Sequence, residues 1–201
     1  MTLSSLVARY INRLEDFDGK EVADISVNEG LFEEAFVLYK KFNENEDAVK
    51  VLINDVDEAG QPCGLNDITR ALEFAQRIDD AAVWSLLAKS QLTRLMCAEA
   101  IESFCKANDP STFQEVISVC FQQAAFEPLI TYLQMARRKT KEQFIDSELI
   151  YAFAMTNRLT ELEDFIAGPN VANVQQVGDR CFDEKLYEAR LSPCKHLTLP
   201  L

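Results

Sequence analysis

The sequence predicts an all-α protein, an α-solenoid of stacked antiparallel helical hairpins (an α-α superhelix), from three observations. A short motif, in which an acidic residue stands near an alanine or leucine, begins an amphipathic segment six times. The alanine or leucine, here called the anchor, falls at positions 35, 71, 100, 129, 162 and 189. The intervals between these anchors are 36, 29, 29, 33 and 27 residues, which is typical of helical-hairpin repeats. Apolar residues recur at steps of three and four, and strand signals are almost absent. Because one hairpin cannot bury its own apolar face, neighbouring hairpins must stack.

Composition and charge favour a folded chain inside the cell and argue against several partners. Hydrophobic residues make up 48% of the 201 positions, enough to fill a core. The formal charge of -13 repels phosphate backbones, so we expect no nucleic-acid partner. No run of 18 apolar residues exists, and the first 18 positions carry arginines and acidic residues where a signal peptide needs an apolar stretch. We therefore expect a cytoplasmic protein.

The helices follow from the apolar periodicity, taken in order along the chain. Residues 3–14 carry one apolar stripe, and Gly19 and Gly30 then interrupt the pattern. Residues 31–39 form the first repeat helix, and its partner begins near Asn45, whose side-chain oxygen is expected to cap free amides. Two glycines, a proline and several acidic residues predict a surface loop at residues 55–66, which accounts for the longest interval between anchors.

The second half continues the alternation of helices and short turns. Trp84 is expected to be the largest core residue of the hairpin formed by residues 68–78 and 82–95. Asp109 and Pro110 predict the start of a helix that carries a stripe over residues 113–121. Residues 168–170 should end one helix and cap the next. The remaining helices are expected at residues 129–135, 144–153, 159–166 and 171–182, and Pro128 falls in a first turn where proline does little harm.

Each candidate for chemistry has a structural explanation that the sequence favours. The six cysteines contain no CxxC pair and stand mostly among apolar helical residues, which predicts buried, reduced thiols. Cys194 and His196 lie close together, but a zinc site needs four ligands and no second pair is near. A single histidine argues against a Ser/His/Asp or Cys/His catalytic system. We expect no catalytic, cofactor-binding or metal-binding residue and no cofactor, so the chain is not expected to be an enzyme.

Three further features also have structural explanations. The basic run at residues 137–141 is interpreted as a solvated helix end, with contact to an acidic face of a neighbouring molecule as the alternative. Aromatic residues inside the stripes, such as Phe36, Phe113 and Tyr132, are expected to pack in the core. Gly178 is expected to permit the close approach of two helices.

Long segments of the chain resemble the leg of the clathrin heavy chain. The resemblance rests on residues 4–14, 28–36, 82–92, 130–139, 148–170 and 175–189, several of which run to ten or more positions. It covers about residues 4–189, nearly the whole chain.

The resemblance implies a structural coat protein without catalytic activity. In that family three long legs of helical repeats join at a hub, and neighbouring legs run side by side as the edges of the polyhedral cage on coated pits and coated vesicles in endocytosis and intracellular protein transport. This segment resembles the middle of a leg, so the expected partners are other heavy-chain legs. The β-propeller that reads adaptor peptides is not expected here, so any contact with a membrane is indirect, through adaptors. Light-chain binding is expected mostly beyond Ala189. The isolated segment should be monomeric.

Two departures from the family pattern stand out. The loop at residues 55–66 is longer and more acidic than the family's turn, although extending a surface loop costs little stability. After Ala189 the family continues a helix, whereas Pro193 and Pro200 forbid one here. We therefore expect one domain at residues 1–189 and a disordered tail at residues 190–201. The alternative to a coat protein is an endolysosomal tethering or sorting subunit with the same repeat type.

Overall fold

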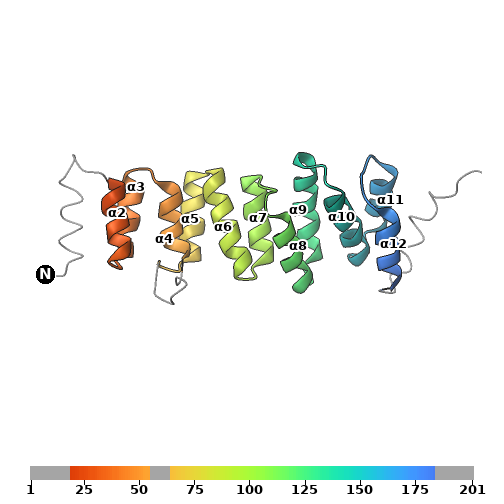
Figure 1. Ribbon diagram of the computed structural model, residues 1–201, viewed down its shortest axis with the longest axis horizontal. Helices are drawn as coiled ribbons and strands as arrows, with labels where there is room; N and C mark the ends of the chain where they lie inside the picture. The colour runs from red at the N-terminus through yellow and green to blue at the C-terminus, as the bar shows by residue number, and fades with distance from the viewer. Residues whose placement is uncertain (1–18, 55–63, 184–201) are drawn as a thin grey trace, which may run out of the picture. The chain divides into compact units, whose positions relative to one another are not determined.

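Eleven helices account for 77% of the residues that the computed structural model describes, which are 19–54 and 64–183, and this part of the chain contains no strand. The expected all-α class is therefore confirmed (Figure 1). The expected helix at residues 3–14, most of the loop at 55–66, the anchor Ala189 and the expected tail at 190–201 lie outside the described residues. The chain divides into two units, residues 1–94 and 95–201, which are described separately.

Five helices form the described part of the first unit. Helix α4 packs against α3 on one side and against α5 and α6 on the other, while α2 packs against α3. Turns of two or three residues reverse the chain between α2 and α3, α3 and α4, and α5 and α6, which makes these pairs antiparallel. The helices are α2 (Gly19–Asn28), α3 (Phe32–Lys41), α4 (Asn45–Ile53), α5 (Ile68–Ile78) and α6 (Ala81–Thr93).

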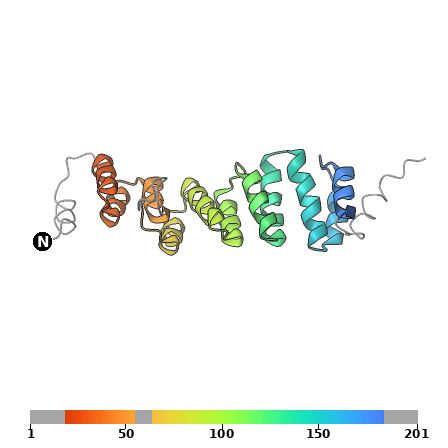
Figure 2. The same ribbon diagram turned by 60° about the horizontal axis from the view of Figure 1, so that its bottom comes forward.

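The second unit repeats this arrangement with six helices between residues 97 and 183. Each helix from α7 to α11 packs against a sequence neighbour, and α7 also contacts α9 while α10 contacts α12. These contacts between alternate helices join successive hairpins, whose order along the chain can be followed in Figures 1 and 2. The helices are α7 (Cys97–Ala107), α8 (Phe113–Gln122), α9 (Phe126–Lys139), α10 (Gln143–Met155), α11 (Leu159–Ala167) and α12 (Val174–Asp183).

The repeat anchors seen in the sequence occupy one structural position. Each described anchor is the fourth residue of an odd-numbered helix, from α3 to α11. All five side chains are completely buried: Ala35, Ala71, Ala100, Leu129 and Leu162. The period of 27 to 36 residues therefore reflects packing: each repeat needs a buried alanine or leucine at the anchor, because its size sets how closely the helices approach.

A second repeated feature lies in the turns. One residue in the left-handed region stands two positions before the first residue of seven helices: Gly30, Asn43, Asn66, Asp79, Leu95, Ala124 and Asn157. Paired backbone hydrogen bonds of the Schellman type close the preceding helix at five turns. These turns contain the left-handed residues Gly30, Asn43, Asn108, Ala124 and Asn157. At Ala124, for example, its amide donates to the Phe121 carbonyl and the Ala125 amide donates to the Cys120 carbonyl. These bonds satisfy carbonyls that the helix itself leaves without partners.

The core residues confirm most of the packing that the sequence predicts. Trp84 is only 2% exposed, and its indole Nε1 donates to Asp79 Oδ1 at 3.0 Å. Phe36 meets Phe74 edge to face at 5.5 Å, and Tyr132 meets Phe104 in the same way at 5.7 Å. Phe113, by contrast, is only half-buried, with its ring 6.3 Å from that of Phe144.

Several local predictions are wrong, and each error has a local cause. The prediction interrupts the pattern at Gly19, but Gly19 begins α2, and its missing side chain makes room for Phe42: a Cβ there would lie 2.0 Å from the ring. Helix α4 does begin at Asn45, yet the capping position is Glu44 and no side chain caps the helix. Helix α6 ends at Thr93, two residues earlier than predicted.

Two more predicted helix starts lie elsewhere in the structure. Asp109 Oδ1 accepts a bond from the Ser111 amide, but this closes only a local turn, and α8 starts at Phe113. Asn170 does not cap α12: its amide nitrogen instead donates to the carbonyls of Phe165 and Ile166 at the end of α11. The side chain that accepts from the α12 amide of Gln176 belongs to Asn173.

Gly178 does not mediate a close helix approach. A Cβ built on it would have no atom within 4 Å in the described structure. Gly64, like Gly19, does lie in a tight environment: a Cβ there would lie 2.6 Å from the Val51 carbonyl oxygen. There the chain returns from the acidic loop and covers the end of α4.

Candidate interaction surface

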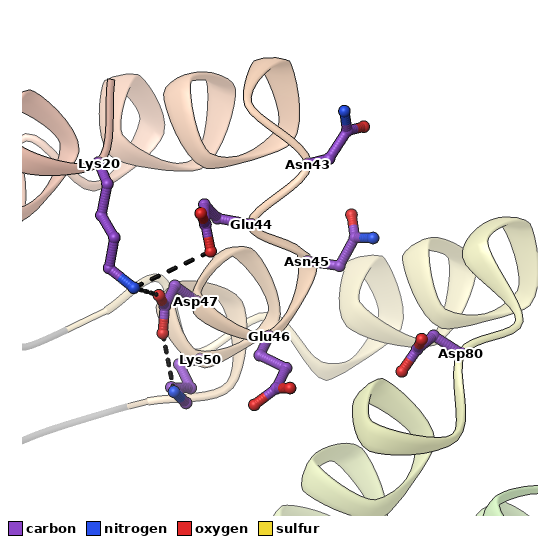
Figure 3. A pocket seen from close by; sticks show the side chains of 8 residues that line it. All are labelled: Lys20, Asn43, Glu44, Asn45, Glu46, Asp47, Lys50 and Asp80. Atoms are coloured by element: carbon purple, nitrogen blue, oxygen red, sulfur yellow. Dashed lines mark hydrogen bonds and ion pairs between the residues drawn. The ribbon is translucent and has the colours of Figure 1, made fainter. Parts of the chain in front are cut away.

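A polar hollow of about 360 Å³ lies in the first unit, where α2, the α3–α4 turn and α4 come together (Figure 3). Lys20 Nζ reaches from α2 to Asp47 Oδ2 at 2.9 Å, and Lys50 Nζ contacts the other Asp47 oxygen at 2.7 Å. Glu44 lies 3.9 Å from Lys20. The lining residues are Lys20, Asn43, Glu44, Asn45, Glu46, Asp47, Lys50 and Asp80.

The ion pairs of this hollow centre on Asp47, which both lysines contact. Burial alone would raise the pKa of Asp47, but hydrogen bonds from Lys50 and Lys20 outweigh it and hold that pKa below its ordinary value. The hydrogen bond from Lys20 to Asp47 raises the pKa of Lys20. The lining offers amides, amines and carboxylates but no hydroxyl, thiol or imidazole. The arrangement therefore fastens α2 to α4.

Charged pairs also join successive hairpins at roughly the repeat interval. Arg70 of α5 reaches Glu33 of α3 through two parallel bonds of 2.7 and 2.8 Å. The bond from Arg70 lowers the pKa of Glu33, and the guanidinium lies 4.7 Å from the ring centre of Phe36. In the second unit Arg158 approaches Glu127 of α9 at 3.4 Å. These partners are 37 and 31 residues apart, so the same kind of bridge recurs along the array.

Arg180 forms the most enclosed of these bridges. From α12 it contacts both oxygens of Glu148 on α10, at 3.2 and 3.1 Å. Its guanidinium lies 3.7 Å from the ring centre of Tyr151 and 5.0 Å from that of Phe121. Burial raises the pKa of Glu148, and the charge of Arg180 opposes that rise. A groove of about 190 Å³ beside this pair is lined by Gln143, Phe144, Ser147, Glu148, Asn173, Gln176, Val177 and Arg180.

The basic run at residues 137–141 is not simply a solvated helix end, because Arg137 is part of the framework. Its Nε donates to Asp146 Oδ1 at 3.0 Å, its Nη2 donates to the Pro169 carbonyl at 3.1 Å, and its guanidinium lies 4.4 Å from the ring centre of Phe165. Asp146 is 5% exposed and also accepts from the Val171 amide. Arg137 thus ties the end of α9 to α10 and to the turn after α11.

The rest of the basic run does face solvent. Arg138, Lys139 and Lys141 are exposed, and Lys139 Nζ donates to the Asn108 carbonyl at 2.8 Å. Arg138 and Lys141 form no ion pair within the described ranges 19–54 and 64–183. Exposed apolar side chains are scattered over both units: Ile25, Val37, Ile78, Leu95, Phe144, Val171 and Phe182. The described surface thus carries isolated apolar side chains, together with charged pairs that recur at roughly the repeat interval.

The described cysteines are free thiols. Cys97, Cys120 and Cys181 are buried, as predicted, while Cys105 is half-buried. Burial raises the pKa of Cys120 to about 12, which keeps the thiol protonated and unreactive. Cys63, Cys194 and His196 lie outside the described residues. Among the described ones, no group of three or more His, Cys, Asp or Glu is placed to hold a metal ion, and no helix has the length and apolar character needed to cross a membrane.

Comparison with known proteins gives one consistent family. The family model for the region found in clathrin and VPS proteins matches twice, at residues 4–95 and 104–196. These two matches correspond closely to the two units of the fold. Each copy therefore covers several consecutive hairpins.

Curated relatives agree with the family model. Clathrin heavy chain of Drosophila melanogaster is 47% identical over 183 residues, which is 91% of this chain and 10% of the relative. Clathrin heavy chain 1 of Arabidopsis thaliana is 49% identical over 185 residues, covering 92% of this chain and 10% of that protein. Clathrin heavy chain 2 of Homo sapiens is 45% identical over 183 residues, 91% of this chain and 11% of its own length. The chain thus spans about a tenth of these relatives.

Proposed function

This chain belongs to the clathrin heavy-chain family, and from that premise we propose that it is a leg segment that helps to build the polyhedral lattice of coated vesicles in endocytosis and intracellular protein transport. We assign it a structural role without catalytic activity. Its place is the cytoplasmic face of coated pits and coated vesicles.

The observation that carries the proposal is identity of 45–49% spread over more than nine-tenths of the chain, in species as distant as a fly and a plant. The alternative of an endolysosomal tethering or sorting subunit has no comparable support, because the relatives described above are all named clathrin heavy chains.

The mechanism we propose is stiffness combined with weak lateral contact. Buried anchors and bridges such as Arg70–Glu33 and Arg180–Glu148 resist the sliding of one hairpin on the next. The partners are other heavy-chain legs, which lie alongside this one and touch its exposed charges. Single contacts of this kind are weak, and they sum to a reversible lattice when many legs are linked.

The partners of the segment follow from its place in the leg. We expect it to bind neither nucleic acid nor a membrane directly, with adaptors making the membrane contact elsewhere in the heavy chain. Light-chain binding is assigned elsewhere as well. Because lateral contacts become effective only through multivalency, the isolated chain should be monomeric and should compete weakly with intact legs.

Light scattering of clathrin assembly with increasing amounts of this chain tests the proposal. We expect the chain alone to form no cages, and to slow assembly of full-length heavy chain in a manner that added salt weakens, because exposed charges are screened. Tight binding of the chain to adaptor peptides, or cages formed by it alone, would contradict the assignment to the middle of a leg.

A matched pair of variants locates the contact. Arg138→Glu with Lys141→Glu reverses the exposed basic charges after Arg137, whereas Lys40→Glu with Lys89→Glu makes the same change in charge on α3 and α6. If the basic run touches an acidic face of a neighbouring leg, only the first pair should lose the ability to slow assembly. Equal loss in both pairs would mean that overall charge, and not this surface, causes the effect.

A further inference from the structure

The turn between α9 and α10 presents a hydroxyl directly after the basic run. Thr140 is the C-cap residue directly after α9, and its backbone is extended, with φ of −125° and ψ of 117°. Its amide donates to the Ala136 carbonyl at 2.9 Å, while its hydroxyl makes no hydrogen bond to the described part of the chain. The side chain is half-buried, so it stands at the surface and is not part of the core.

Arg137 lies three residues before Thr140 in the sequence, and Arg138 lies two residues before it. Basophilic protein kinases read this spacing, because carboxylates in their substrate groove pair with guanidinium groups through two parallel hydrogen bonds. We propose that Thr140 is a phosphorylation site for a kinase of this class, and that its phosphate acts on the Arg137–Asp146 tether.

The reaction uses ATP as the phosphoryl donor. The Thr140 Oγ1 attacks the γ-phosphorus, a new O–P bond forms, and the bond from that phosphorus to the β–γ bridging oxygen breaks so that ADP leaves. The hydroxyl proton passes to the catalytic aspartate of the kinase. No oxidant or other co-reactant is needed.

The tether controls access to the site. Arg137 is engaged by Asp146, the Pro169 carbonyl and the Phe165 ring, so a kinase that binds both arginines must first detach it. Arg138 is exposed and forms no ion pair within the described residues, so it is available for kinase contact without any change in the fold. The folded chain is therefore a slower substrate than the same segment as a free peptide.

The phosphate in turn weakens the tether. It carries a charge of about −1.5 to −2 and three acceptor oxygens, and it would stand three residues after Arg137 in the sequence. It therefore competes with the single charge of Asp146 for the same guanidinium. The position also precedes α10, whose first residue is Gln143, and free amides at a helix start favour an anion. Phosphorylation thus loosens the hold of α9 on the turn at residues 168–171. This inference does not depend on the proposed coat function.

The test incubates the full chain with ATP, magnesium and a basophilic kinase, and locates phosphate by tandem mass spectrometry. We expect phosphate at Thr140, none in Thr140→Ala, and an unchanged rate in the control Thr131→Ala, which alters an exposed threonine of α9 with no arginine before it. Arg138→Gln should slow the reaction by roughly tenfold, the effect of losing one charged hydrogen bond. Asp146→Asn should speed it, because Arg137 is released.

A peptide of residues 134–144 separates recognition from access. Failure of the peptide to accept phosphate overturns the proposal, and so does phosphate on the peptide with none on either the folded chain or Asp146→Asn. If Asp146→Asn does not fold, the peptide, the full chain and Arg138→Gln still decide the question. Hydrogen exchange tests the second half: the Val171 amide should exchange faster after phosphorylation, and unchanged exchange would overturn the effect on the tether.

Discussion

An added methyl group has opposite consequences at two glycines of this chain. At Gly64 a Cβ would lie 2.6 Å from the Val51 carbonyl oxygen and 2.7 Å from that of Asn54. Both are backbone atoms that also hold the chain in place: the Leu65 amide donates to Val51 and the Asn66 amide to Asn54. Gly178 sits inside α12 with open space around it. The helical backbone there gains nothing from glycine, which only adds freedom to the unfolded chain.

We expect Gly64→Ala to lower the free energy of unfolding by about 1–3 kcal/mol, because the segment that follows the acidic loop must shift away from α4. Gly178→Ala should raise the free energy by about 0.5–1 kcal/mol. Urea unfolding of both variants measures the difference. Stabilisation by both would mean that the chain after the acidic loop does not approach α4 as closely as the structure places it.

Asp47 makes the stability of the first unit depend on pH. The bonds from Lys50 and Lys20 hold its pKa below the ordinary value of 3.8, so the folded state binds this proton less tightly than the unfolded state does. Its stabilising contribution is therefore complete at neutral pH and is lost as the pH falls through 3.8 toward the lowered value.

We expect Asp47→Asn to be less stable than the natural chain at pH 7, and the gap to narrow near pH 3, where the natural aspartate takes up its proton. Urea unfolding at the two pH values measures it. Glu46→Gln is the control, because Glu46 is exposed and lines the same hollow without an ion pair to a described residue. An equal gap at both pH values for Asp47→Asn would contradict the assigned role of the lysine bonds.

At the scale of the element, the ends of the helices are closed by backbone more than by side chains. Helix α4 is the clearest case, since all four of its final carbonyls have partners. The amides of Asn54, Leu65 and Asp67 reach the first three, and Arg94 Nη2 donates to the Ile53 carbonyl at 2.6 Å. The long acidic loop is thereby anchored at both ends to one helix. This explains how the array accepts a long loop at this point without losing its stacking.

The left-handed turn residues give a prediction for helix α8. Ala124 has φ of 52°, a conformation that costs an L-residue free energy and that glycine adopts readily. Ala124→Gly should therefore raise the free energy of unfolding by about 0.5–1 kcal/mol. Ala98→Gly, at an exposed position in the first turn of α7, should lower it, because glycine is a poorer helix former than alanine. Opposite signs in thermal or urea unfolding support the turn geometry, and destabilisation by both would contradict it.

At the scale of the whole molecule, the chain consists of two units that each hold a core. Every buried anchor after Ala71 belongs to the second unit, as do the Arg137–Asp146 and Arg180–Glu148 bridges. In a repeat array, stability is a sum of repeats and of contacts between neighbours. Each unit therefore has buried anchors and helix–helix contacts of its own.

Residues 95–201 produced alone should fold. We expect a helical far-ultraviolet circular dichroism spectrum and a cooperative urea transition, because α7 to α12 bury their apolar faces against one another. Within this piece, Leu129→Ala should lower the free energy of unfolding by about 2–5 kcal/mol, as for other buried leucines, whereas the exposed Thr131→Ala should change it little. A coil spectrum for the unmodified piece would show that the second unit depends on the first.

The sequence by itself determined the repeat, the helical class and the family, because apolar spacing of three and four residues and a buried anchor such as Leu129 leave direct traces in the order of residues. It also located Trp84 in the core and Pro128 in a first turn. Only the tertiary structure decided what the polar residues do. Asn170 closes the helix before it and not the one after it, and Arg137 reaches Asp146 and Pro169 instead of solvent. Leu95 and Ala124 take left-handed turns that their side chains do not favour. The physical reason is that such roles depend on which groups lie within hydrogen-bonding distance in space, and a period along the chain does not specify that distance.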